Sequence, residues 1–369
     1  MGGLLHGEEP LNREPEIREL CSMFITEDGY DRNHGPLPEK KQLNSRAYRV
    51  RIDGYVGRPL NLSIANLRSN FRQHEVTCAL QCAGNRRHDM RTVVKEVQGI
   101  DWSDGAVMNC RWRGPLLKDI LEKAGIVCLG ADNHFHVAFA SFKVECQDDS
   151  WYGASIPLSR ALDSDKEIIL ALERNGRPLS IRHGYPVRVI TPGLAGARSV
   201  KWLDRIAVQE EESQNHYMQR DYKALPPQAT DSISAEVYWG VTPAVQEMPV
   251  NSVIVGPRTG DEIERDDHGY IECYGYALPS GEGGPVVKVE ISTDGGYTWT
   301  EAKLEHHEGE GKWTWKFWRV KVAVPPGESR VIFSKATDAA SKTQPGQPPW
   351  NLRGICYNGY GEARDLTFH

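Results

Sequence analysis

Apolar and polar residues follow both strand-like and helix-like patterns along the first two-thirds of the chain. Residues 48–52 alternate between apolar and charged side chains, which predicts a strand. Residues 116–124 carry apolar side chains at helical spacing, and Gly125 after them predicts the end of a helix. Short apolar runs at 168–172 and 186–191 predict two further strands. This mixture of short elements predicts an α+β domain.

A different pattern begins near Val250. Residues 287–291 alternate between apolar and polar side chains, and Asp294 with the two glycines after it predicts a turn. Residues 313–324 predict a longer strand, which ends at the two prolines that follow. Strands at this regular spacing predict an all-β sandwich of immunoglobulin-like type.

We therefore expect three parts. Residues 1–30 are polar and rich in Pro and Glu, which predicts an extended arm that adds little to the core. Residues 31–240 form the predicted α+β domain, and residues 245–369 form the predicted sandwich. The pattern loosens over 228–248, which is typical of a linker that crosses between domains.

The segment around Cys82 concentrates the candidate chemistry. Apolar and small residues precede Cys82 and Gly84 follows it, which predicts a buried strand that ends in a sharp turn at a cleft. Arg86 and Arg87 lie within a few residues of the sulfur. Nearby cations favour a thiolate, which is both a nucleophile and a metal ligand, and guanidinium groups pair with oxyanions.

From the residues alone, three interpretations of Cys82 remain open: a buried structural cysteine, a catalytic nucleophile, or a soft-metal ligand. Cys78 lies four residues before it, and no second cysteine pair or Cys/His cluster follows at zinc-like spacing. We therefore expect no metal cage made by the protein alone, whereas a thiolate that completes a cofactor-borne metal site stays open.

Cationic residues gather in the loops of the predicted α+β domain. Gly193 and Gly196 precede Ser199 and Lys201, and glycines of this kind allow a backbone to approach a phosphate closely. The functional interpretation is a phosphate-bearing cofactor, and the alternative is a glycine-rich turn beside salt bridges. The cations concerned are Arg32, Arg86, Arg87, Arg182, Arg188, Arg198 and Lys201, with Arg353 from the far end of the chain.

Five stretches, in order along the chain, resemble motifs of the sulfite oxidase family, which also includes the molybdenum domains of assimilatory nitrate reductases. Cys82 begins the second of them, Cys-Ala-Gly-Asn-Arg-Arg, which resembles the family's molybdenum-binding segment. The stretches are residues 32–36, 82–87, 152–156, 183–188 together with 196–202, and 350–354.

The resemblance implies an α+β molybdopterin-binding domain followed by the immunoglobulin-like domain, and a molybdenum–molybdopterin cofactor bound through Cys82. It implies oxidation of sulfite to sulfate by oxygen-atom transfer. The residues that match the family's catalytic and substrate positions are Cys82, Arg87, Tyr222, Arg32, Arg353 and Trp102. Those that match its cofactor contacts are Arg32, Asn33, His34, Cys82, His183, Arg188, Ser199, Val200 and Lys201.

Tyr222 and Arg353 favour sulfite over nitrate, because the nitrate reductases of the family typically have Asn and Met at these positions. The alternatives are a nitrate or sulfoxide reductase of the same family, or a metal-free binding protein that keeps the fold. Two residues depart from the family pattern: Arg182 replaces an acid, and Lys143 lies near the position of an Asp that contacts the pterin. The chain after Arg353 also differs, at residues 356–360.

Composition and net charge limit the kinds of partner and the cellular location that we expect for this protein. The 369 residues are 39% hydrophobic and 25% charged, and the net charge of -6 gives no support to nucleic-acid binding. No apolar run is long enough for a membrane span, and the start resembles neither a signal peptide nor a mitochondrial presequence. We expect an intracellular soluble protein, cytoplasmic rather than peroxisomal or mitochondrial, without haem, FAD or NAD. Electrons would pass to oxygen or to a separate cytochrome-type carrier, and the resemblance implies a homodimer through the C-terminal domain.

Overall fold

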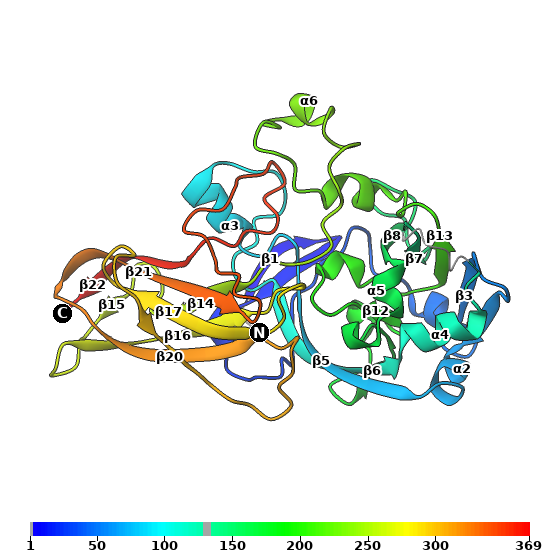
Figure 1. Ribbon diagram of the computed structural model, residues 1–369, viewed down its shortest axis with the longest axis horizontal. Coiled ribbons are helices and arrows are strands. Elements are labelled where there is room, and N and C mark those ends of the chain that lie inside the picture. The colour runs from blue at the N-terminus through cyan, green and yellow to red at the C-terminus, as the bar shows by residue number, and fades with distance from the viewer. Residues whose placement is uncertain (1–2, 128–133) are drawn as a thin grey trace.

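The computed structural model describes residues 3–127 and 134–369 and has an α+β part and an all-β part (Figure 1). In the α+β part, a five-stranded sheet has the order β4-β3-β13-β7-β8, and β13 pairs parallel to β3 and antiparallel to β7. The strands are β3 (Arg49–Gly54), β4 (Leu60–Ser63), β7 (His136–Ser141), β8 (Tyr152–Pro157) and β13 (Arg205–Gln209).

A second sheet carries the Cys82 segment. Its order is β11-β10-β6-β5, and β12 pairs with β9 as a separate two-stranded sheet. These strands are β5 (Gln73–Gln81), β6 (Val107–Pro115), β9 (Ile169–Ala171), β10 (Glu173–Arg174), β11 (Arg177–Pro178) and β12 (Arg188–Ile190).

The helices of this part are short. Apolar residues at helical spacing bury one face of α4 in the core, and Gly125 ends the helix with a positive φ of 68°. The helices are α2 (Ile64–Ser69), α3 (Arg87–Asp89), α4 (Leu117–Ala124), α5 (Leu158–Leu162) and α6 (Ser232–Ala235). Single 3₁₀ turns lie at Lys40–Leu43, Ser164–Lys166, Ile181–His183 and Gly196–Arg198, and π-helical turns at Met90–Val94 and Tyr217–Asp221.

The C-terminal part is a sandwich of two sheets, with the orders β14-β16-β20-β19 and β15-β22-β21-β17-β18. Val289, Ile291, Trp318, Ile332 and Leu366 pack between them in one apolar cluster. The strands are β14 (Asn251–Gly256), β15 (Glu262–Ile263), β16 (Tyr270–Leu278), β17 (Val286–Ser292), β18 (Thr300–Glu301), β19 (Lys303–Leu304), β20 (Lys316–Ala323), β21 (Gly327–Asp338) and β22 (Gly361–Phe368).

The predicted fold class, an α+β domain followed by an all-β sandwich, is confirmed. Among residues 3–127 and 134–369, no helix has the length and apolar character that crossing a membrane requires.

The N-terminal segment differs from the extended arm with little core that we expected. From Gly3 on it forms the hairpin of β1 (Gly3–Glu8) and β2 (Leu11–Pro15) and then α1 (Ile17–Leu20). Ile17, Leu20 and Phe24 are buried in a cluster with Val107 of the α+β part and Trp315 of the sandwich. Three apolar side chains thus pack between the two parts, although the segment as a whole is polar.

Arg86 joins the two parts just beyond Cys82. Its guanidinium is almost completely buried and donates hydrogen bonds to Asn251 Oδ1 at 2.7 Å, to the Gly359 carbonyl at 2.8 Å and to the Tyr360 carbonyl at 2.7 Å. Its backbone is left-handed, with φ at 64°. Arg86 therefore links the two parts of the structure. Of the two adjacent arginines, Arg87 is the candidate for anion binding.

We expect Arg86→Gln to lower the melting temperature by about 5 °C, because a shorter neutral side chain leaves buried carbonyl groups without donors. The matched control is Arg364→Gln, which removes an exposed ion pair with Glu362 and should shift the melting temperature by about 1 °C or less. Differential scanning calorimetry measures both. Equal melting temperatures for the two variants would contradict the structural role.

Candidate functional site

Cys82 follows the last residue of β5, where the chain leaves the sheet. The Cys82 amide still bonds to the Ala106 carbonyl at 2.9 Å, and the Asn85 amide then turns back to the Cys82 carbonyl at 3.0 Å. The Gly84 amide points at Sγ at 3.4 Å. A Cβ at Gly84 would lie 2.7 Å from the Arg87 guanidinium carbon, so glycine is needed there for close packing. The thiol is 5% exposed and lies between two cavities.

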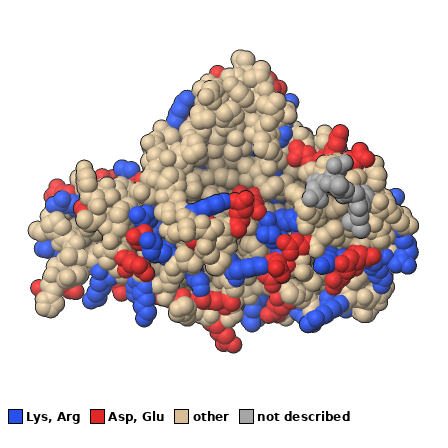
Figure 2. Space-filling model, viewed as in Figure 1, with Lys and Arg blue, Asp and Glu red and all other residues tan. Residues whose placement is uncertain are grey.

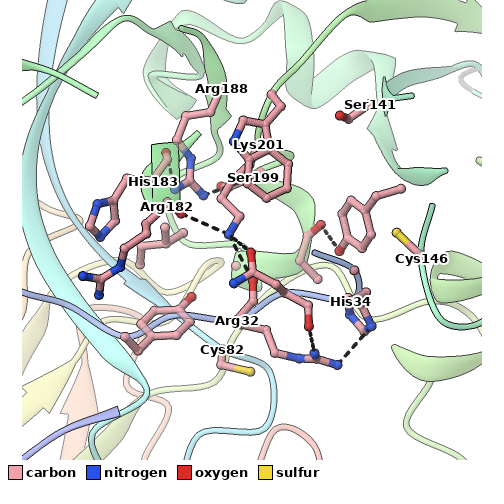
Figure 3. Close-up of a pocket in the computed structure, with 18 of the residues that line it drawn as sticks. Arg32, His34, Cys82, Ser141, Cys146, Arg182, His183, Arg188, Ser199 and Lys201 are labelled. Atoms are coloured by element: carbon pink, nitrogen blue, oxygen red, sulfur yellow. Dashed lines mark hydrogen bonds between the residues drawn. The ribbon is translucent and has the colours of Figure 1, made fainter. Parts of the chain in front are cut away.

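The larger cavity holds about 770 Å³ of empty space, its open mouth included. Figure 3 shows its polar side chains, several of which come from the loop before β3, from the turn Ile181–His183, from the start of β12 and from the segment that precedes β13. The lining residues with polar or sulfur-containing side chains are Tyr30, Arg32, Asn33, His34, Cys82, Met108, Ser141, Cys146, Tyr152, Arg182, His183, Arg188, Ser199, Lys201, Trp202 and Tyr222.

Several buried donors in this cavity have neutral partners or none. Arg188 donates to the His183 carbonyl at 3.1 Å and to the Ser199 carbonyl at 2.8 Å, and its Nε has no partner. His183 Nε2 and Ser141 Oγ are also buried without partners. Burial lowers the pKa of the Arg188 guanidinium to about 10 and that of His183 to about 2. The cavity thus presents positive charge and free hydrogen-bonding groups together.

Lys201 lies at the centre of the cluster in Figure 3. Its ammonium donates to the carbonyls of Arg32 and Arg182, both at 3.2 Å, and to the side-chain oxygen of Asn33. Burial first, and then the charge of Arg188, lower the pKa of Lys201 to about 7. An anion in the cavity would restore the charged form of this lysine.

The smaller cavity shares Arg32, Cys82 and Tyr222 with the larger one and holds about 300 Å³ of empty space, its mouth included. Three guanidinium groups line it, from Arg32, Arg87 and Arg353, together with Trp102 and Tyr222. Residues that are 266 positions apart in sequence meet here, since Arg87 Nε donates to the Arg353 carbonyl at 2.9 Å. The space suits a small anion.

The three guanidiniums differ in their partners. Arg87 also donates to the Ile100 carbonyl at 2.7 Å, and burial lowers its pKa to about 10. Among the described residues, Arg353 pairs with the carboxylate of Asp221 at 3.0 Å, while its buried Nε has no partner there. Most of the positive charge in the smaller cavity is therefore available to a bound anion.

His34 orients the hydroxyl of Tyr222. Arg32 Nη2, which can only donate, lies 3.0 Å from His34 Nδ1, so that His34 carries its hydrogen on Nε2 and donates it to Tyr222 Oη at 2.8 Å. Burial, with the charge of Arg32 next, holds the pKa of His34 well below its ordinary value. Burial raises the pKa of Tyr222 to about 12. Tyr222 therefore keeps its proton and is free to donate it into the cavity.

The structure brings most of the sequence-predicted residues to one or both cavities. Those that line them are Arg32, Asn33, His34, Cys82, Arg87, Trp102, His183, Arg188, Ser199, Lys201, Tyr222 and Arg353. The Val200 side chain instead belongs to the apolar core behind the larger cavity, so only its backbone can face a cofactor.

The two departures from the family pattern have different positions. Arg182 lines the larger cavity and pairs with Asp28 and Asp31, which neutralises its charge at the rim. Lys143 pairs with Asp204 at 3.4 Å and lies over the Tyr48 ring, and it does not line the cavity. Only Arg182 can affect what the cavity holds.

Sequence reasoning missed several lining residues. Tyr152 belongs to one of the five matching stretches and Asp221 precedes Tyr222, so both had a signal that was not used. Tyr30, Ser141 and Cys146 lie outside the matching stretches, so no motif singled them out.

A phosphate-bearing anionic cofactor fits the larger cavity. The unpartnered Nε of Arg188, Nε2 of His183 and Oγ of Ser141 are suited to oxygen atoms of such a group, and Lys201 gains from its charge. Cys82 borders both cavities, so a metal carried by the cofactor could meet the thiolate there. Among residues 3–127 and 134–369, no group of three or more His, Cys, Asp or Glu side chains could hold a metal ion by itself.

Comparisons with known proteins point to molybdenum enzymes. Residues 34–217 match the family model "Oxidoreductase molybdopterin binding domain", and residues 242–363 match "Mo-co oxidoreductase dimerisation domain". Human mitochondrial sulfite oxidase is 42% identical over 366 residues, which cover 96% of this chain and 64% of the human protein. Arabidopsis thaliana sulfite oxidase is 37% identical, with 95% and 90% of the two chains covered.

Two further proteins have a lower sequence identity to this chain. The nitrate reductase [NAD(P)H] of Hordeum vulgare is 36% identical over 96% of this chain and 40% of that protein. The sulfane dehydrogenase SoxCD of Paracoccus pantotrophus has a similar fold, with a TM-score of 0.76 at 23% identity, over 97% of this chain and 87% of that one. This chain spans about two-thirds of the length of the animal relatives, 64% in the human case.

We expect inorganic phosphate to bind the protein prepared without other ligands, and to bind with uptake of protons above pH 7. Burial lowers the pKa of Lys201 to about 7, so Lys201 is mostly neutral at pH 8 and regains a proton as the anion binds. Calorimetric titration at pH 8 in buffers of different ionisation enthalpy should give uptake of about one proton or less per phosphate.

The control is Lys201→Met, which keeps the length of the side chain without an ammonium. It should show weaker binding and no uptake beyond that of phosphate itself. If it takes up as many protons as the unmodified protein, Lys201 does not face the anion.

Proposed function

The chain belongs to the sulfite oxidase family, and on this premise we propose that it oxidises sulfite to sulfate at a molybdenum–molybdopterin centre bound through Cys82. The observation that carries the proposal is the position of one thiol between two cationic cavities of different size. The larger one fits the phosphate-bearing pterin, and the smaller one fits a small dianion.

Different residues of the two cavities would bind different parts of the cofactor. Cys82 would ligate the molybdenum, and Arg188 and His183 would bind the phosphate and pterin through Nε and Nε2, which have no partner among the described residues. Ser199 would contribute its hydroxyl and Lys201 its positive charge. The loop that carries Arg32, Asn33 and His34 would cover it. When bound, the cofactor supplies the two-electron redox change and the transfer of an oxygen atom.

In the smaller cavity, the guanidiniums of Arg32, Arg87 and Arg353 would bind the sulfite oxygens and orient its sulfur toward Cys82. Sulfite would compete with Asp221 for Arg353, because both are anions that need the same guanidinium. The Tyr222 hydroxyl would donate a hydrogen bond to an oxygen of sulfite or of the product. The buried Trp102 closes one wall and limits access of water.

The complete reaction consumes water and releases two electrons and two protons for each sulfite. We propose that the electrons pass to oxygen or to a separate carrier protein, and that the protein is a homodimer through residues 242–363, the segment that matches the dimerisation model. Three guanidiniums around the smaller cavity favour dianionic sulfite over monoanionic nitrate as its occupant.

We expect the molybdenum-loaded protein to oxidise sulfite with ferricyanide as acceptor, and to reduce nitrate with reduced viologen at least about a hundredfold more slowly, a difference of about 3 kcal/mol in activation free energy. Cys82→Ser should keep the melting temperature and lose sulfite turnover together with molybdenum. Steady-state kinetics and elemental analysis test this.

Preferential nitrate turnover would overturn the choice of substrate. A folded protein from a molybdenum-replete host that contains almost no molybdenum would point instead to a metal-free binding protein.

We expect Arg353→Met to raise the KM for sulfite about tenfold and to change kcat by less than about threefold, since it removes one charge-assisted contact from the anion. The matched control is Arg220→Met, which removes a nearby, more exposed ion pair with Glu236 and should leave both constants unchanged. Equal KM values for these two variants would remove Arg353 from the sulfite site.

A further inference from the structure

The hairpin of β1 and β2 is held against the loop that carries Arg32. Arg13 and Asp31 exchange backbone hydrogen bonds at 2.9 and 2.8 Å, so that an isolated antiparallel bridge joins the loop to the hairpin. The Asn33 side chain donates to the Leu11 carbonyl at 2.6 Å. This places a segment more than twenty residues away from Asn33 beside both cavities.

Asn12 makes the contact that reaches Arg32. Its Oδ1 accepts from Arg32 Nη1 at 3.1 Å and from the Asn33 amide at 3.0 Å, and its Nδ2 donates to the Pro10 carbonyl at 2.9 Å. The side chain is 4% exposed. Both polar atoms of its side chain therefore have partners, and these contacts fix its orientation.

The partners of the Arg32 guanidinium are neutral. Nη1 donates to Asn12 and to the Asn33 carbonyl, and Nη2 donates to His34, which burial keeps uncharged. An amide oxygen can hold a guanidinium in place without cancelling its charge, whereas a carboxylate at the same position would do both. The contrast is Arg182, which pairs with Asp28 and Asp31 at the rim.

The hairpin also contacts the segment that carries Trp102, which lines the smaller cavity. Glu14, two residues after Asn12, accepts from the Ser103 amide at 2.8 Å and from the Gly105 amide at 2.9 Å. Both amides lie within three residues after Trp102 in the chain. His6 of β1 packs edge-to-face on the Trp102 ring, with 4.7 Å between the ring centroids. One short hairpin thus contacts both the cationic and the aromatic wall.

We propose that Asn12 is a positioning residue for anion binding: its neutral amide holds Arg32 toward the smaller cavity and leaves the charge of Arg32 free for the substrate. This inference deepens the proposed function, because it concerns the same anion site. It predicts that a neutral acceptor and a negatively charged acceptor at this position give different affinities for the anion, so that the presence of an acceptor alone is not sufficient.

The test compares Asn12→Asp and Asn12→Ala in the molybdenum-loaded protein. Asn12→Asp keeps an oxygen acceptor but adds a negative charge beside Arg32, so sulfate should bind about tenfold more weakly and the KM for sulfite should rise about tenfold, with kcat changed by less than about threefold. Asn12→Ala removes the anchor, so that kcat and KM should both worsen. Calorimetric titration with sulfate and steady-state kinetics measure these effects.

The matched control is Arg13→Gln on the same strand, which loses side-chain contacts to Asp28 and Asp31 but none to Arg32. It should bind sulfate as the unmodified protein does. Melting temperature and molybdenum content are measured for every variant. A purely structural role of Asn12 predicts that affinity falls only in step with these two quantities, and that Arg13→Gln behaves like Asn12→Asp.

The inference fails if Asn12→Asp binds sulfate as tightly as the unmodified protein, or if its loss of affinity follows the loss of stability. It also fails if the unmodified protein does not bind sulfate. The proposed function fails separately, if the unmodified protein binds sulfate but does not oxidise sulfite. In that case the sulfate affinities of the variants still decide the role of Asn12.

Discussion

Positive charge buried next to Cys82 is the constraint on which the rest of the site depends. Removing a guanidinium or ammonium from water is costly unless it is paired, and the low pKa values of Arg87, Arg188 and Lys201 record that cost. The fold accepts it by surrounding these groups with carbonyl oxygens that orient them without neutralising them. An anion that enters either cavity recovers this electrostatic free energy, which links stability of the site to its occupancy.

Adjacent residues with the same side chain have different roles because the backbone turns between them. Arg86 has a left-handed backbone conformation, and its side chain points into the junction with the sandwich, where Asn251, Gly359 and Tyr360 accept its hydrogen bonds. Arg87 begins α3 and points back across the turn to the smaller cavity. The junction therefore fixes the segment that presents Cys82, and the sandwich supplies Arg353 from the far end of the chain (Figure 1). Figure 2 shows acidic and basic side chains interspersed over the face in view.

Local patterns predicted the elements whose stability is local. The helix at α4 and the strand β3 follow from residue spacing, and the Cys82 turn follows from the glycine after it. The hairpin β1–β2 was missed because the bridge to Asp31 and the packing of Ile17 and Phe24 join segments that are distant in sequence. The chemical roles came from the resemblance, since composition and spacing cannot show which arginines converge. Asn12 lay outside both kinds of reasoning, because its importance depends on the guanidinium that it contacts.

The arginines of the site fall into two groups, those with carboxylate partners and those with neutral partners. Arg182 at the rim of the larger cavity is neutralised by Asp28 and Asp31, and the partly exposed Arg353 is paired with Asp221. Arg87 and Arg188, which are buried, are held by carbonyl groups, and the partly exposed Arg32 is held by an amide, a carbonyl and an imidazole. Carboxylates at these positions would stabilise the empty protein and compete with the anion it must bind. Neutral acceptors give up part of that stability, and in return these guanidiniums keep their charge for the ligand.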